Sequence, residues 1–161
     1  TIMLALGDAL AVATLERKGF SPSDFQLLHP GGMLGRRLLR VADLMHRGDS
    51  LPLAKADEKM DEALITMTAK SFGCVGVVDS QGRLVGIITD GDLRRHMGDD
   101  LLHRTVSEIM TRNPKTIDAE ALASEAVNLM NARKITTVFV LEDARPVGVV
   151  HIHDCLRAGV V

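Results

Sequence analysis

Apolar residues recur at helical spacing in two well separated stretches of the chain. "MDEALITM" at 60–67 and "ASEAVNLM" at 123–130 both place apolar residues at positions i, i+3, i+4 and i+7. This spacing brings the apolar side chains to one face of a helix. The pattern therefore predicts two amphipathic helices, each with one buried stripe.

Short apolar runs rich in β-branched residues follow each predicted helix. They lie at 75–78 and 84–88 after the first helix, and at 138–141 and 147–150 after the second. A few polar residues separate the two runs of each pair, so each pair predicts a β-hairpin. An extended piece precedes each helix, and a second helix follows each hairpin. The predicted order in each unit is strand, helix, strand, strand, helix, an α/β (α+β) fold class.

The two units are copies of one sequence repeat. "VADLM" at 41–45 recurs as "VSEIM" at 106–110, and "LVGIITDGDLRR" at 84–95 recurs as "PVGVVHIHDCLR" at 146–157. The offset between matching segments falls only from 65 to 62 residues along the chain. The predicted boundaries are 41–98 for the first repeat, 99–105 for a linker and 106–161 for the second repeat. Because so small a unit buries little surface alone, the two repeats are expected to pack together.

A helical leader is predicted ahead of the repeats, over residues 1–40. Residues 1–18 are mostly apolar and are followed by a glycine, which predicts a helix that ends there. Ser21, followed by proline, favours the start of a second short helix. The stretch "LHPGGMLGRR" at 28–37 is a glycine-rich turn without the lysine of a phosphate-binding loop. Because the chain begins within the leader helix, it is expected to be a fragment of a longer protein.

Composition argues against nucleic acid as a partner. Of the 161 residues, 46% are hydrophobic but only 2% are aromatic, with no Trp or Tyr. A platform of aromatic side chains for single-stranded nucleic acid is therefore not expected. The formal charge is −2 and the basic residues are scattered, which is not the pattern of a duplex-binding surface.

The sequence also predicts a cytoplasmic protein with no membrane partner. The apolar stretch 2–15 is too short for a membrane span and contains Asp8. The two cysteines, Cys74 and Cys155, lie in apolar patterns. This favours buried thiols in a reducing compartment over a disulfide.

The duplicated unit, with "GIITDGDL" at 86–93 and "GVVHIHDCL" at 148–156, resembles a tandem pair of cystathionine-beta-synthase (CBS) domains over residues 41–161. The resemblance implies that the two units join through their sheets, with a cleft on each side of a pseudo-twofold axis. Such clefts commonly take adenine nucleotides or related ligands. It also implies a homo-oligomer formed through CBS pairs.

The leader resembles the end of the isomerase domain of the D-arabinose 5-phosphate isomerase family. The resemblance lies in "GDALAVATLERKGFSPSDFQLLHPGGMLGRRL" at 7–38. It implies a parent enzyme that interconverts ribulose 5-phosphate and arabinose 5-phosphate, for Kdo and lipopolysaccharide biosynthesis, without a required cofactor. His29 of "HPGG" would then serve catalysis only in the full-length parent. Because the rest of the isomerase domain is missing, the chain alone is predicted to be inactive.

Thr89 and Asp92 match the family's pattern of a hydroxyl residue, two spacers and an aspartate. The hydroxyl suits a phosphate oxygen, and the carboxylate accepts both ribose hydroxyls. The resemblance extends the predicted nucleotide-binding residues to the backbone of Cys74, Val75 and Gly76, for the base edge, and to Arg94 and Arg95, for phosphate.

Other interpretations of the same residues compete with nucleotide binding. Asp92 is also well placed to cap the helix that follows it. A metal held by Asp90 and Asp92 would need further oxygen ligands, which the next residues lack, so no metal is predicted. Catalysis by the carboxylate pair, or by Cys74 as a nucleophile, lacks any partner that the sequence identifies.

The second repeat departs from the hydroxyl pattern. His151 replaces the hydroxyl residue while Asp154 is kept, so phosphate binding there would depend on imidazole protonation. Thr116 and Thr137 are candidates to supplement this cleft. A zinc site on "HIHD" is the alternative, but the nearby sequence supplies no clear further ligands.

The sequence therefore predicts a regulatory nucleotide-binding module. The candidate ligands are AMP or ATP and, because a first enzyme is usefully controlled by its pathway's activated product, the nucleotide sugar CMP-Kdo. The alternative, from another class of function, is a ligand-free oligomerisation module whose clefts are only boundaries between packed elements.

Overall fold

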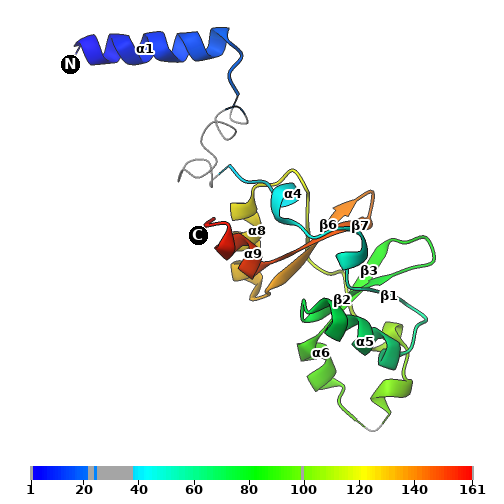
Figure 1. Ribbon diagram of the computed structural model, residues 1–161. Helices are drawn as coiled ribbons and strands as arrows, with labels where there is room; N and C mark the ends of the chain where they lie inside the picture. Colours follow the sequence, from blue (N-terminus) through cyan, green and yellow to red (C-terminus); the bar gives the residue numbers. More distant parts are fainter. Residues whose placement is uncertain (1, 22–23, 25–37, 99, 161) are drawn as a thin grey trace. The chain divides into compact units, whose positions relative to one another are not determined.

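The computed structural model describes residues 2–21, 24, 38–98 and 100–160 (Figure 1). The chain divides into two compact units, Thr1–Leu38 and Leu39–Val161, which are described separately. His29 and most of the second predicted leader helix lie outside the described residues.

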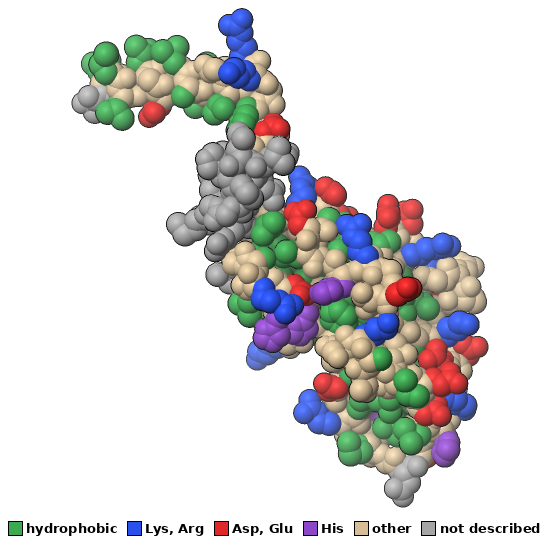
Figure 2. Space-filling view, viewed as in Figure 1, with side chains coloured by type: hydrophobic (Ala, Val, Ile, Leu, Met, Phe, Trp, Pro, Cys, Tyr) green, Lys and Arg blue, Asp and Glu red, His purple; other side chains and the backbone are tan. Residues whose placement is uncertain are grey.

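The first unit contains helix α1 (Ile2–Arg17), as the leader pattern predicts. Gly19, at φ +63°, follows the helix, and its N–H donates to the carbonyl of Glu16 at 3.0 Å. Hydrophobic side chains cover much of α1 in Figure 2, and none of its described residues is buried; Ile2 is 85% exposed. An apolar helix surface of this kind is typical of a helix that is covered by a partner.

Removal of residues 1–20 is expected to increase solubility and to leave the melting temperature of the second unit unchanged. The reason is that α1 contributes exposed apolar surface and no buried side chain. Size-exclusion chromatography and thermal unfolding of the full chain and the truncated chain check this. A fall of several degrees in the melting temperature after truncation would contradict it.

The second unit contains the two predicted repeats of strand, helix, strand, strand and helix. In the first these elements are β1 (Leu53–Lys55), α5 (Met60–Lys70), β2 (Cys74–Val78), β3 (Leu84–Thr89) and α6 (Asp90–Arg95). In the second they are β5 (Thr116–Ile117), α8 (Ala123–Arg133), β6 (Thr137–Glu142), β7 (Arg145–His151) and α9 (Ile152–Arg157). The fold class predicted from the sequence is therefore confirmed.

Each repeat has its own small sheet. β1 pairs in parallel with β2, and β2 pairs with β3 in an antiparallel hairpin; β5, β6 and β7 repeat this arrangement. The first sheet has the order β1-β2-β3-β4, where β4 (Thr111–Arg112) follows the linker. Short helices complete the unit: α4 (Val41–Leu44), η1 (Gly48–Ser50), η2 (Leu101–His103) and α7 (Val106–Ile109).

The repeats exchange their first segments. Val41 of α4 is fully buried in the core of the second repeat, and His46 makes a bridge with Val149 of β7. Val106 of α7 is fully buried in the core of the first repeat, and β4 adds to β3. Each packed core therefore contains residues from both sequence repeats.

The two repeats meet at a shared apolar cluster. Phe139 of β6, Cys74 of β2 and Val149 of β7 are buried there. The Phe139 ring lies so close to Gly76 that a Cβ added at Gly76 would meet Phe139 Cζ at 2.7 Å. The cluster joins the two cores into one folded unit.

Candidate functional site: a cavity shared by the two repeats

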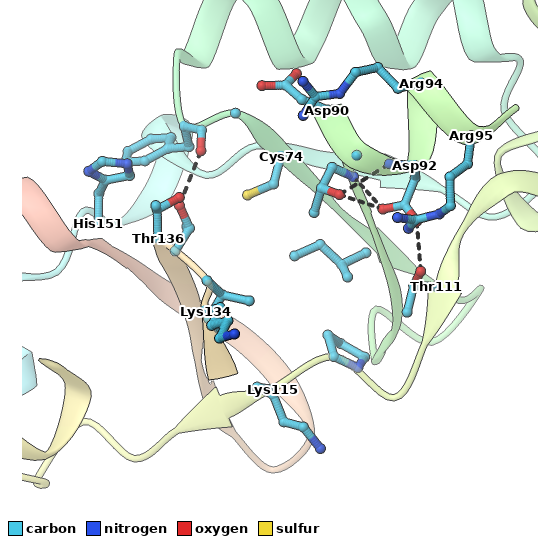
Figure 3. Close-up of a pocket in the computed structure, with 18 of the residues that line it drawn as sticks. Cys74, Asp90, Asp92, Arg94, Arg95, Thr111, Lys115, Lys134, Thr136 and His151 are labelled. Atoms are coloured by element: carbon cyan, nitrogen blue, oxygen red, sulfur yellow. Dashed lines mark hydrogen bonds and ion pairs between the residues drawn. The ribbon is translucent and has the colours of Figure 1, made fainter. Parts of the chain in front are cut away.

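A cavity of about 650 Å³ opens beside this cluster, a size usual for sites that take small organic ligands. In Figure 3, Asp92 and Arg95 lie on one side of it, His151 lies on another, and Lys115 and Lys134 lie along a third edge. Both repeats supply its walls, including the loop between β4 and β5.

Thr89 and Asp92 lie where β3 passes into α6, and they cap this helix. Thr89 is the N-cap residue, with φ −123° and ψ 167°. Its N–H and its hydroxyl both donate to Asp92 Oδ2, at 2.8 Å and 2.6 Å. The helix-cap interpretation of Asp92 is therefore confirmed as a structural role.

The other oxygen of Asp92 is also bonded. Thr111 Oγ1, from β4, donates to Asp92 Oδ1 at 2.8 Å, and Arg95 donates to the same oxygen at 2.5 Å. Burial alone would raise the pKa of Asp92, but the hydrogen bonds from Thr89, Thr111 and Arg95 outweigh it and lower the pKa below its usual value. The carboxylate is thus charged and only 2% exposed. A ribose that binds it must displace Thr111 or Arg95.

The cavity wall carries an excess of positive charge. Arg94, Lys115 and Lys134 line it, and within the described residues none of the three forms an ion pair. Asp90 is the carboxylate on this wall that no salt bridge engages, since Asp92 is paired with Arg95. Lys134 ends α8 in the left-handed region, at φ 54°. This charge distribution suits an anionic ligand.

Cys74 also faces the cavity (Figure 3). Burial raises the pKa of its thiol to about 12, although the Thr137 hydroxyl partly offsets the effect. The thiol therefore remains protonated at neutral pH, which makes it a poor nucleophile.

Asp154 repeats the environment of Asp92 in the second repeat. The N–H of His151 donates to Asp154 Oδ2 at 3.0 Å, and Arg157 donates to Asp154 Oδ1 at 2.6 Å. His46 Nε2, from the segment after α4, lies 3.1 Å from Asp154 Oδ2. Burial opposes ionisation of Asp154, but these hydrogen bonds outweigh it and lower its pKa.

The two networks are related by the sequence repeat. The N-cap residue, the aspartate and the arginine of the second network each follow their counterparts by 62 residues: Thr89 and His151, Asp92 and Asp154, Arg95 and Arg157. Thr111 corresponds to His46 at an offset of 65 residues. Two threonines around the first carboxylate are thus two histidines around the second.

The cavity collects seven of the eleven residues that the sequence predicts for nucleotide binding: Cys74, Thr89, Asp92, Arg94, Arg95, Thr137 and His151. Thr137 and His151 were predicted for a second cleft but line the same cavity as Thr89. The other four lie elsewhere, for reasons of strand geometry and local pairing. Val75 points into the first core, Gly76 faces Phe139, Thr116 pairs with β6, and Asp154 is turned toward His46 and Arg157.

Sequence reasoning did not assign Thr111 or Lys115 to the site, nor Ser71, Phe72 and Gly73 before β2. The repeat contained a usable signal for part of this wall. Ser71 and Lys134 occupy equivalent positions after α5 and α8, 63 residues apart, and both line the cavity. Thr111 could be assigned to the site only with the knowledge that the repeats exchange their first segments.

Within the described residues, no group of three or more His, Cys, Asp or Glu side chains is placed to hold a metal ion. Around "HIHD", His151 Nδ1 accepts from the N–H of His153 at 3.2 Å, and both Asp154 oxygens are bonded. The helices of the described residues also include none that is long and apolar enough to cross a membrane.

Two strand–helix–hairpin–helix repeats that share one cavity define a tandem-repeat α/β module. A family model for the CBS domain matches residues 41–99 and 106–161. The chain therefore belongs to the CBS domain family, as a tandem pair.

The curated relatives that match this chain are longer proteins. The chain is 48% identical over 165 residues to the arabinose 5-phosphate isomerase KdsD of Pseudomonas aeruginosa, covering 100% of this chain and 51% of the relative. It is 46% identical over 164 residues to KdsD of Escherichia coli K12, covering 100% and 50%. The chain thus spans about half the length of the curated relatives it matches.

Solved CBS structures have the same fold. The CBS pair of protein MJ0100, in complex with 5′-methylthioadenosine and S-adenosyl-L-methionine, is 28% identical with a TM-score of 0.66. The match covers 74% of this chain and 94% of that one. CBSX2, solved with AMP, is 22% identical with a TM-score of 0.65, covering 75% and 96%, and supports the fold alone.

Proposed function

We propose that this CBS pair is a regulatory module that binds a nucleotide in the cavity between its repeats. The observation that carries the proposal is the composition of the cavity wall. Asp92 and Thr89 lie together at the start of α6, and Arg94, Lys115 and Lys134 lie around the same space. A carboxylate for ribose and several cations for phosphate are the groups that nucleotide recognition needs.

The adenosyl ligands of the MJ0100 CBS pair support this ligand class. The adenosine part of such a ligand has the same ribose, whether a phosphate or a methionine is attached to the adenosine. The excess of cations in the cavity here favours a ligand with anionic groups, such as AMP, ATP or CMP-Kdo. The acidic sugar of CMP-Kdo would use Lys115 and Lys134 in addition to a phosphate site.

We further propose that the parent is a cytoplasmic D-arabinose 5-phosphate isomerase, homo-oligomeric through its CBS pairs. The matches to KdsD proteins over all of this chain support it. In that parent His29 would contribute to the isomerase active site, and the nucleotide would control carbon flow toward Kdo and lipopolysaccharide. The CBS pair alone would have no isomerase activity.

A ligand-free oligomerisation module is the second candidate. The observation that favours it is the hydrogen bonding of Asp92, whose two oxygens are already occupied by Thr89, Thr111 and Arg95. Under this hypothesis the network is purely structural.

A thermal-shift titration with AMP, ATP and CMP-Kdo separates the two candidates. A ligand at a hundred times its dissociation constant stabilises the folded state by about 2.7 kcal/mol. We expect at least one of the three to raise the melting temperature. If none does so at millimolar concentration, the oligomerisation function is favoured instead.

Reversal of charge at Lys115 and Lys134 is expected to weaken binding of the stabilising nucleotide by about tenfold, or about 1.4 kcal/mol. Both side chains line the cavity without an ion-pair partner among the described residues. The matched control is Lys55→Glu, on the exposed end of β1 and outside this cavity. Calorimetric affinities for the K115E/K134E and K55E variants check the result, and equal losses in both would contradict it.

A further inference from the structure

His151 has two contacts that make its protonation state matter. It is the N-cap residue of α9, and its side chain lines the cavity. Its Nδ1 accepts a hydrogen bond from the N–H of His153 at 3.2 Å. Only a deprotonated Nδ1 has a lone pair to accept with, so the capping form of the ring is neutral, with its proton on Nε2.

The equivalent residue in the first repeat has no such constraint. The Thr89 hydroxyl accepts from the N–H of Asp92 at 3.4 Å while it donates to Asp92 Oδ2 at 2.6 Å. A hydroxyl therefore caps its helix at every physiological pH. An imidazole either caps the helix as a neutral acceptor or carries a positive charge, and it does not do both.

The groups around His151 set the balance between these two forms. His153, Asp154 and Arg157 lie on α9, and the segment after α4 contributes His46. Burial, His153, Arg157 and His46 lower the pKa of His151 and outweigh the opposing effect of Asp154. The neutral capping form is thus the resting form.

The remaining neighbours add no negative charge close to the ring. On the sheet, His151 pairs with Thr137 of β6, which is uncharged. Across the cavity the wall carries Arg94, Lys115 and Lys134, with Asp90 as the opposing charge. An anion that enters this space would be the nearest counter-charge for a protonated imidazole on its open side.

We propose that His151 couples binding of an anionic ligand in the cavity to uptake of a proton, with the ring exchanging its capping bond to His153 for contact with the ligand's anionic group. This inference rests on the proposed nucleotide site and adds its regulation by pH. Because a nearby anion favours the charged imidazole, the complex binds more protons than the unliganded protein. By linkage, affinity for the anion then increases as the pH falls from 8 to 6.

The test compares three proteins with AMP as the probe: wild type, His151→Thr and His103→Gln. Threonine restores the residue of the first repeat and is itself a favoured N-cap. His103 lies in η2, outside the cavity, and controls for the loss of a histidine elsewhere. Calorimetry at pH 6, 7 and 8, in buffers of different ionisation enthalpy, gives the affinity and the number of protons taken up.

We expect the affinity of the wild type relative to H151T to increase by about threefold to tenfold between pH 8 and pH 6, with proton uptake in the wild type that H151T lacks. The phosphate of AMP titrates in both proteins, so its contribution cancels in this ratio. H103Q is expected to follow the wild type.

The outcomes separate this inference from the proposed function. If AMP binds to the wild type and to H151T with the same pH dependence and the same proton uptake, the role of His151 is wrong and the nucleotide site stands. If none of AMP, ATP and CMP-Kdo binds to any of the three proteins, the nucleotide site itself is wrong and this inference falls with it.

Discussion

Alanine in place of Phe139 is expected to lower the free energy of unfolding of the CBS pair by about 3–5 kcal/mol. The ring is fully buried in the cluster that joins the two repeats, and it packs against Gly76. Removing the ring leaves a void that neither sheet fills easily, because the glycine that faces the void has no side chain. Since folded domains are stable by only about 5–15 kcal/mol, the variant would lose a large part of its stability.

Urea unfolding of the second unit measures this loss. The control is Ile65→Ala on α5, where the side chain is 70% exposed and the expected change is within about 0.5 kcal/mol. Similar losses for F139A and I65A would show that the cluster does not hold the repeats together.

Asp92→Ala is expected to weaken nucleotide binding by about tenfold or more and also to destabilise the fold by about 1–3 kcal/mol. The first effect follows from the ribose-binding role that the resemblance implies for Asp92. The structure adds the second effect, because the variant leaves Thr89, Thr111 and Arg95 without the acceptor that they share. Calorimetry and thermal unfolding of the same preparations measure both quantities.

Asp154→Ala is the matched control for this variant. It removes the equivalent carboxylate of the second repeat, which holds Arg157 and His46 but lies outside the cavity. We expect D154A to lose stability like D92A and, at pH 8, where the His151 ring is neutral, to keep its nucleotide affinity. Equal affinities in D92A and the wild type would assign Asp92 to helix capping alone.

Acid should weaken both networks in the same direction. The folded-state pKa values of Asp92 and Asp154 are lowered, because their hydrogen bonds outweigh the effect of burial. Groups of this kind contribute stability that is present above their unfolded pKa, about 3.9, and is lost as the pH falls through the folded pKa.

The sequence predicted the local elements well because their signals are local. The apolar stripe of α5 and the short β-rich runs of β2 and β3 are each visible within their own segment of sequence. The second repeat shows the same patterns again. The exchange of α4 and α7 was not predicted. Their short sequences, "VADL" and "VSEI", are alike, so nothing in either indicates which core receives it.

The candidate site was predicted where one short motif contains it. Thr89 and Asp92 are three residues apart and were found together, whereas Thr111 reaches Asp92 only because β4 pairs with β3. Lys115 comes from the loop between β4 and β5, a position without a periodic signal. Side chains brought together by long-range pairing are the part of a site that sequence patterns do not reveal.

The exchanged segments also fix when this module can finish folding during protein synthesis. The N–H of Val41 donates to the carbonyl of Ala121, and His46 pairs with Val149, so these early residues can form their contacts only after partners 80 and 103 positions later have been made. Contacts this distant in sequence slow folding, because a long loop must close before they form. While the ribosome is still translating the second repeat, the first repeat already has α7 and β4, but its own opening segment has no core to enter. The docking of α4 therefore follows the synthesis of β7, and a nascent chain stalled before β7 would expose Val41 to chaperones.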